Sequence, residues 1–135
     1  MNYAILRTAK LKTMGNIGGS LAHSYRMIET PNADPNLTPK NHHSVATPEA
    51  VKQIIKDRLP EKRRADAVLC IEYLITASPE WEGWGKSQEA EFFKRSAQWL
   101  MDKHGEGNIA GMSIHRDIST PHLVAYVIPI DQKGK

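Results

Sequence analysis

The sequence His-Arg-Asp-Ile-Ser-Thr-Pro-His, residues 115–122, and its continuation Leu-Val-Ala-Tyr-Val-Ile-Pro-Ile, residues 123–130, decide how this chain is interpreted. The residues before it, 109–114, alternate with a period of two and predict a strand, because successive side chains point to opposite faces of a sheet. One face of that strand carries Ser113 and leads to His115. The other face carries Ala110, Met112 and Ile114.

The Ser-Thr-Pro segment at 119–121 predicts a turn, because Pro121 cannot donate to a strand ladder. One face of the strand that follows carries His122, Val124, Tyr126 and Ile128. His115 and His122 therefore stand at the facing ends of adjacent strands, where two imidazoles can hold one metal ion. A strand-turn-strand with two polar ends and no metal fits the same spacing.

Length and composition indicate one globular domain covering residues 1–135. The chain is 40% hydrophobic and 24% charged, which are ordinary values for a single domain. One cysteine, Cys70, excludes an internal disulfide and a zinc site built from several cysteines, and it agrees with a cytoplasmic location. No apolar run approaches the roughly 20 residues of a membrane helix, and no signal peptide opens the sequence.

The charge is unevenly distributed along the chain. Residues 1–64 carry 11 Lys and Arg against 5 Asp and Glu, a net charge of +6, whereas residues 65–135 carry 7 against 10, a net charge of −3. A basic half favours a polyanionic partner, because phosphate contacts dominate affinity for nucleic acid. The candidate phosphate contacts are Arg7, Lys10, Lys12, Arg63 and Arg64. Each of them, taken singly, also fits an ordinary solvated charge.

The first 28 residues predict a strand, a turn and a helix. Residues 3–12 alternate as a strand, and the glycine-rich residues 15–19 predict a turn. This segment lacks the Lys-Ser/Thr pair of a phosphate-binding loop and is not a nucleotide site. Residues 20–28 predict a short helix that carries His23, Tyr25 and Arg26.

The middle of the chain predicts a long loop, a helix and a buried strand. Residues 30–47 contain many prolines and asparagines and predict an extended loop. The next helix runs from the cap Thr47 to residue 59. Residues 67–76 predict a central strand that contains Glu72. A buried carboxylate there needs a partner, although a half-exposed position also fits.

Residues 87–104 have the clearest helical spacing, and Gly105 provides a C-terminal stop. The order of elements is strand, helix, helix, strand, helix and a terminal hairpin. Strands that return through long helical connections predict an α+β fold, in which a central antiparallel sheet is flanked by helices.

Several segments, taken in chain order, resemble the Mob/Pre plasmid mobilisation and recombination proteins, which are relaxases of the HUH endonuclease group. They are NYAILRTAKLKTMGNIGGSLAHSYR, ETPNADP, RADAVLCIEYLITAS, HGEGNIAGMSIHRD and STPHLVAYVIPID. The resemblance implies an HUH relaxase-like fold. It also implies a plasmid mobilisation relaxase that nicks one strand of origin-of-transfer DNA through a covalent protein–DNA intermediate, with a divalent metal, Mn²⁺ or Mg²⁺.

The family motif His-x-Asp-Glu-x-Thr-Pro-His-x-His matches this chain at His115, Asp117, Thr120, Pro121 and His122. The resemblance therefore implies that His115 and His122 bind the metal. His23 matches the histidine proposed as nucleophile in this branch, where other relaxases use tyrosine. Arg26 matches the basic residue three positions later.

Two positions depart from the motif: its Glu is Ile118 here and its final His is Val124. A metal held by two imidazoles and water binds weakly. Asp117 is a candidate to complete the site, and Glu72, His42 and His43 are more distant ones. Family members also continue beyond Ile130 with the rest of the catalytic domain and an oligomerisation region, so we expect this chain to be a truncated N-terminal part.

Two candidate nucleophiles lie close together in the sequence. His23 would give a phosphoramidate and Tyr25 a phosphotyrosine. Residues two apart on a helix face different directions, whereas Arg26 shares the face of His23. We expect His23 to be the nucleophile, with Tyr25 as the alternative and an exposed helical histidine as the non-functional interpretation.

Two other functions compete with the nicking enzyme. One is a non-catalytic origin DNA-binding module with a degenerate metal site. The other is a metal-independent phosphoesterase that uses two histidines as acid and base. Such an enzyme would carry a hydroxyl residue two positions after each histidine. Asp117 and Val124 stand there instead, which argues against it.

Overall fold

The computed structural model describes residues 4–28, 30–31, 33–63, 65 and 67–130. Its sheet is antiparallel, with the strand order β1-β3-β5-β4-β2. The strands are β1 (Ala4–Leu11), β2 (His42–His43), β3 (Cys70–Ala77), β4 (Ile109–His115) and β5 (His122–Val127). The helices are α1 (Met14–Ser24), α2 (Pro48–Arg58) and α3 (Ser87–His104), with short 3-10 turns at Thr38–Lys40 and Glu106–Asn108.

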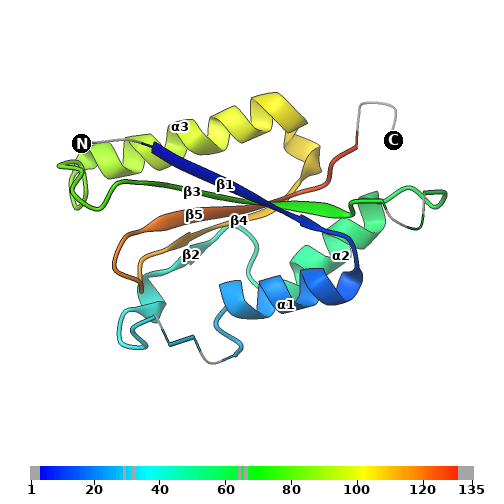
Figure 1. The fold of residues 1–135 in the computed structure, drawn as a ribbon, viewed down its shortest axis with the longest axis horizontal. Coiled ribbons are helices and arrows are strands. Elements are labelled where there is room, and N and C mark those ends of the chain that lie inside the picture. The colour runs from blue at the N-terminus through cyan, green and yellow to red at the C-terminus, as the bar shows by residue number, and fades with distance from the viewer. Residues whose placement is uncertain (1–3, 29, 32, 64, 66, 131–135) are drawn as a thin grey trace.

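The sheet lies between two helical layers (Figure 1), with α3 on one face and α1 and α2 on the other. Each face has its own core. Toward α3 the core contains Tyr73, Ile75, Phe93, Leu100, Leu123, Ala125 and Val127. Toward α1 and α2 it contains Ile17, Leu21, Val51, Ile55, Leu69, Cys70, Ala110, Val124, Tyr126 and Ile128. The predicted α+β fold with a helix-flanked antiparallel sheet is confirmed.

The predicted helices in the middle of the chain are confirmed. The hydroxyl of Thr47 accepts a hydrogen bond from the Ala50 amide and caps α2, with Pro48 in the first turn. The helix α3 spans Ser87–His104 as predicted, and Gly105 ends it with φ of 89°, a conformation that favours glycine. Among the described residues, no helix is long and apolar enough to cross a membrane.

The glycine-rich segment was predicted to be a turn, and this prediction is wrong because it lies inside α1. The Thr13 hydroxyl accepts from the Asn16 amide at 2.9 Å and caps the helix. Ile17 and Leu21 are buried on its inner face. A side chain at Gly18 would begin 3.4 Å from the amine of Lys52 on α2. Packing against the sheet and α2 therefore outweighs the poor helix propensity of glycine.

Two strand predictions also need correction. The long loop contains an unpredicted edge strand, β2, which pairs with Ile114 and Ser113 of β4. In β4 the register shifts between Ile109 and Gly111. This bulge turns Ala110 into the core beneath α1 and α2, and not onto the face of Met112 as predicted. Past the bulge the predicted alternation holds through to His115.

Candidate active site

A pocket of about 270 Å³ lies between the C-terminal end of α1 and the turn that joins β4 to β5. The strands contribute its floor, and α1 with the segment after it contributes one wall. Its lining residues are His23, Ser24, Arg26, Thr30, Glu72, Leu74, His115, Ile118, His122 and Val124. The pocket therefore brings together residues that lie about a hundred positions apart in the sequence.

His115 and His122 form a directly opposed pair on antiparallel strands. Opposed residues of a ladder point to the same face of the sheet, and here that face is the one covered by α1. The predicted arrangement of the two histidines on adjacent antiparallel strands is confirmed. Their sharing of one ion stays a prediction.

The ring nitrogens of the two histidines are oriented by backbone carbonyls. The Nε2 of His115 lies 2.9 Å from the carbonyl oxygen of Ser24 and 3.1 Å from its hydroxyl, so Nε2–H donates to the carbonyl. The Nδ1–H of His122 donates to the carbonyl of Thr120. These bonds leave the lone pair on Nδ1 of His115 and on Nε2 of His122, which is the state that a metal ligand requires.

The surroundings of both imidazoles favour the neutral form. Burial, followed by the nearby charge of Arg26, lowers the pKa of His115 to about 4. Burial is also the main reason that the pKa of His122 lies below its usual value. Because only the neutral ring can donate a lone pair, these lowered pKa values favour metal binding.

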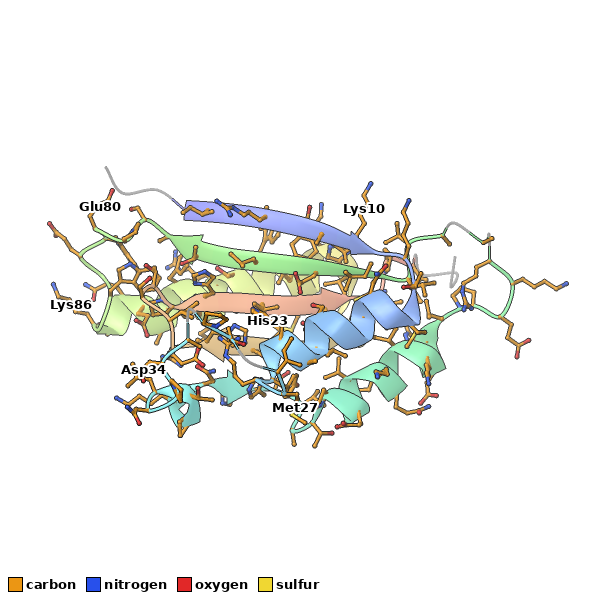
Figure 2. All side chains as sticks on the ribbon, turned by 60° about the horizontal axis from the view of Figure 1, so that its bottom comes forward. Lys10, His23, Met27, Asp34, Glu80 and Lys86 are labelled. Atoms are coloured by element: carbon orange, nitrogen blue, oxygen red, sulfur yellow. The ribbon has the colours of Figure 1, made fainter. Side chains whose placement is uncertain are left out.

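The two candidate nucleophiles point in different directions. Figure 2 shows His23 at the end of α1 beside β5, and its side chain is exposed and lines the pocket. The phenol of Tyr25 instead donates to the carbonyl of Val45 at 2.6 Å, and its ring stacks on His43 with centroids 4.1 Å apart. The geometry therefore supports His23 and leaves Tyr25 beside β2.

Arg26 and Asp117 bind each other at the side of the pocket. The Nε and Nη2 of Arg26 donate to the two carboxylate oxygens at 2.7 and 2.8 Å. This bidentate pair holds the pKa of Asp117 well below its usual range. Asp117 was predicted as a metal ligand, but its carboxylate also accepts from the hydroxyl of Thr38 at 2.9 Å. Both oxygens therefore have protein partners.

A second polar group links α1 to the sheet and includes Glu72, the carboxylate that was predicted to need a partner. Ser20 donates to the carboxylate of Glu72, and its hydroxyl lies 2.8 Å from the phenol oxygen of Tyr126. Glu72 is the carboxylate among the pocket-lining residues. Because Ser20 precedes His23 by three positions on the same helix face, Glu72 lies beneath the face that carries His23.

The basic residues predicted to contact phosphate are dispersed. Arg7 pairs with Leu74, which lines the pocket, and its charge contributes to lowering the pKa of His122. Lys10 projects away from His23 in Figure 2. Lys12 and Arg63 are exposed, and Arg63 donates to the Pro60 carbonyl. Arg64 lies outside the described residues. Their role as DNA contacts stays a prediction.

Two side chains of the pocket are of a type that binds divalent transition metals. The bare nitrogens of His115 and His122 are suitable ligands for Mn²⁺. Among the described residues, however, no group of three or more His, Cys, Asp or Glu side chains comes together. Ile118 lines the pocket where the motif has Glu. Metal binding by His115 and His122, and its expected weakness, stay predictions.

Three comparisons place this geometry among known proteins. The family model described as plasmid recombination enzyme, Mob_Pre, matches residues 1–135. The plasmid recombination enzyme of Streptococcus agalactiae is 32% identical over 97% of this chain and 29% of its own length. The 65 kDa protein of Zymomonas mobilis is 32% identical over 96% of this chain and 24% of its own length. The chain thus spans less than a third of the length of these curated relatives.

Solved structures of a relaxase domain share the fold. The MobM relaxase domain, in a Mn-bound crystal structure with plasmid pMV158 oriT DNA, superimposes with a TM-score of 0.82 at 30% identity. The match covers 98% of this chain and 73% of that domain. A second structure of the same domain, bound to 26 nucleotides of pMV158 oriT DNA, has a TM-score of 0.68 at 32% identity.

Proposed function

Because the chain belongs to the Mob_Pre family of plasmid recombination enzymes, we propose that it forms the N-terminal part of a plasmid mobilisation relaxase. In this proposal the pocket binds a single strand of origin-of-transfer DNA and nicks it by transesterification. The relative that it superimposes on binds Mn and oriT DNA, which supports the same ligands here.

One observation carries the proposal: the pocket holds His23 together with His115 and His122. The first comes from the end of a helix and the other two from a hairpin that begins more than eighty residues later. A nucleophile beside two imidazoles that can hold a metal ion suits metal-assisted cleavage of a phosphodiester.

His23 performs the covalent step in this proposal. A ring nitrogen of His23 attacks the scissile phosphorus, so that a nitrogen–phosphorus bond forms and the phosphorus–oxygen bond to one deoxyribose breaks. The departing oxygen takes up a proton from water and becomes a free hydroxyl end. The second ring nitrogen of His23 releases its proton to a base, and Glu72 is the carboxylate placed in the same pocket to accept it.

The remaining residues hold the substrate and the ion. His115 and His122 would hold the divalent metal, which when bound supplies Lewis-acid polarisation of the scissile phosphate. Arg7, on the strand position opposite Leu74, lies on the pocket side of the sheet and is placed to attract the phosphate backbone.

A second candidate function is origin binding without cleavage. The observation that favours it is Ile118, which lines the pocket in place of a carboxylate. Without this carboxylate, the metal site is less fully occupied at a given metal concentration. The fold and the basic residues of β1 are kept. The two functions differ in whether a covalent complex forms.

Capture of a covalent protein–DNA complex tests the proposal. The chain is incubated with Mn²⁺ and a randomised single-stranded library, and complexes that survive denaturing electrophoresis are collected and sequenced. We expect a complex that acid destroys, because a phosphoramidate is acid-labile and a phosphotyrosine is not. The His23→Ala variant should give none. Binding without any covalent product at high Mn²⁺ would support the non-catalytic function.

A further inference from the structure

The helix α1 ends in a backbone motif that normally uses glycine. The amide of Arg26 donates to the carbonyl of His23, and the amide of Met27 donates to that of Ala22, at 3.1 and 2.8 Å. These two bonds form a Schellman motif. Its left-handed position is occupied by Arg26, with φ of 57°, the one non-glycine residue with positive φ among the described residues.

The side chain of Arg26 explains why glycine is absent from this position. All three of its guanidinium nitrogens are bonded: Nε and Nη2 to Asp117, and Nη1 to the carbonyl of His23 at 2.8 Å. The side chain of Arg26 is 10% exposed and that of Asp117 is completely buried. Glycine would relieve the backbone and leave a buried carboxylate without its cation.

Asp117 also fixes the loop that runs past the pocket. Its carbonyl accepts from the Asp34 amide at 2.6 Å, and its carboxylate accepts from the Thr38 hydroxyl. The side-chain oxygen of Asn41 in turn accepts from the amide of Asp117 at 3.2 Å. Asp117 therefore connects three segments: the end of α1, the loop 34–41 and the turn after His115.

We propose that Asp117 is a positioning residue which, through Arg26, fixes His23 relative to the metal-binding histidines, and that it is not a metal ligand. Arg26 holds the carbonyl of His23 itself, and Asp117 follows His115 by two residues. One ion pair thus joins the helix of the nucleophile to the hairpin of the metal ligands. This inference rests on the proposed function, because it assigns the pair to the cleavage step.

The competing interpretations assign the same two residues to direct contacts. If Asp117 were a ligand, its loss would weaken metal binding. If Arg26 were a phosphate contact, its loss would weaken DNA binding more than the loss of Asp117. A positioning pair instead predicts unchanged affinities and a slower chemical step, because a displacement of about 1 Å costs on the order of 100-fold in rate.

The test compares Asp117→Asn, Arg26→Gly and the double variant with the original chain. Arg26→Gly keeps the left-handed backbone position and removes only the side chain. The matched control is Glu91→Gln, which removes the carboxylate partner of Arg95 from an exposed pair on α3. For each variant, Mn²⁺ affinity is measured by electron paramagnetic resonance titration, DNA affinity by anisotropy, and covalent complex formation in single turnover.

We expect Mn²⁺ and DNA affinities within about twofold of the original in both single variants. We expect the single-turnover rate to fall by about 100-fold in each, and the double variant to be no slower than either, because residues that act as a unit are non-additive. A tenfold loss of Mn²⁺ affinity in Asp117→Asn would overturn the proposal. So would a loss of DNA affinity confined to Arg26→Gly, or unchanged cleavage rates.

Hydrogen exchange gives a readout that does not depend on cleavage. The amides of Arg26 and Met27 should exchange faster in Asp117→Asn and stay protected in Glu91→Gln. If the original chain forms no covalent complex, the proposed function fails. Hydrogen exchange and Mn²⁺ affinity, measured together, still decide whether Asp117 is a positioning residue or a metal ligand. If Asp117→Asn does not fold, Arg26→Lys, which keeps the charge without the bidentate contact, should slow cleavage partially at unchanged Mn²⁺ affinity. An unaltered rate in that variant would count against the inference.

Discussion

His115 and His122 are directly opposed across the β4–β5 ladder, and each ring is held by a backbone carbonyl through a different nitrogen. The turn between them places Asp117 against Arg26 and Ile118 against the pocket. If the two histidines bind a metal ion as proposed, the hairpin offers it two imidazole nitrogens and, at Ile118, an apolar side chain.

We expect Ile118→Glu to raise Mn²⁺ affinity by at least about tenfold, because changes to outer-shell partners alone commonly alter metal affinity by 10–100-fold, and an added ligand should do at least as much. The measurement is a titration of free Mn²⁺ by electron paramagnetic resonance. Ser119→Glu is the matched control. Ser119 is exposed in the same turn and does not line the pocket, so this substitution adds the same charge outside the pocket. Equal gains in the two variants would show that net charge, and not coordination, accounts for the effect.

Val124→His restores the other motif position at a cost in stability. Val124 is 6% exposed and packs in the core beneath α1 and α2. A buried imidazole without a partner lowers the free energy of unfolding by about 1–3 kcal/mol. Because a ligand that binds only the folded state stabilises it, Mn²⁺ should recover part of this loss in urea melts. No recovery at saturating Mn²⁺ would mean that the new ring does not reach the ion.

Tyr25→Phe should keep the covalent DNA complex, whereas His23→Ala should lose it. The Tyr25 phenol donates to the Val45 carbonyl and does not line the pocket. Removing one hydrogen bond should lower the free energy of unfolding by about 1 kcal/mol. Denaturing electrophoresis of labelled DNA measures the first effect and urea unfolding the second. A complex that depends on Tyr25 and survives acid would reassign the nucleophile.

Cys70 should be unreactive in the folded chain. The thiol is fully buried, and burial raises its pKa to about 12, against about 8.5 in an unfolded chain. Between these two pKa values, the thiol of the folded chain therefore keeps its proton and the thiol of the unfolded chain loses it. The resulting stability is present below pH 8.5 and is lost as the pH rises toward 12.

Two measurements check this expectation. Alkylation of Cys70 at pH 9 should proceed at the rate of global unfolding, and the urea midpoint should fall between pH 8.5 and 10. The fall should be smaller in Cys70→Ala, which has no thiol to titrate. Fast alkylation of the folded chain would show that the strand β3 opens locally.

The sequence predicts those parts of the fold that depend on local periodicity. The helix α3 and the alternation of β5 follow from spacing, because each buries one face against a neighbour. Three other features do not follow from spacing: the course of α1 through its glycines, the short strand β2 and the bulge at Ala110. They depend on what packs against them: Lys52 beside Gly18, β4 beside His43, and the α2 side of the core beneath Ala110.

The sequence likewise predicts some residues of the candidate site and not the contacts of others. The motif resemblance and strand parity select His23, His115 and His122, and the pocket contains all three. The partners of Asp117 follow from a left-handed Arg26 and from a loop that reaches Thr38. Nothing in the local sequence marks that conformation, because an arginine at such a position is strained except when a distant carboxylate holds it.

The two faces of β1 offer different surfaces to DNA. Arg7 pairs with Leu74 on the pocket side, whereas Lys10 pairs with Ile71, which packs with the core beneath α3. If the single strand follows the pocket, Arg7→Ala should weaken binding and reduce the slope of log affinity against log salt by about 0.7, the value for one phosphate contact on a single strand. Lys10→Ala removes the same charge from the same strand and should leave the slope unchanged. Anisotropy of labelled single-stranded DNA between about 50 and 200 mM salt resolves this difference. The opposite result, with the slope reduced only by Lys10→Ala, would place the DNA on the α3 side of the sheet and separate it from His23.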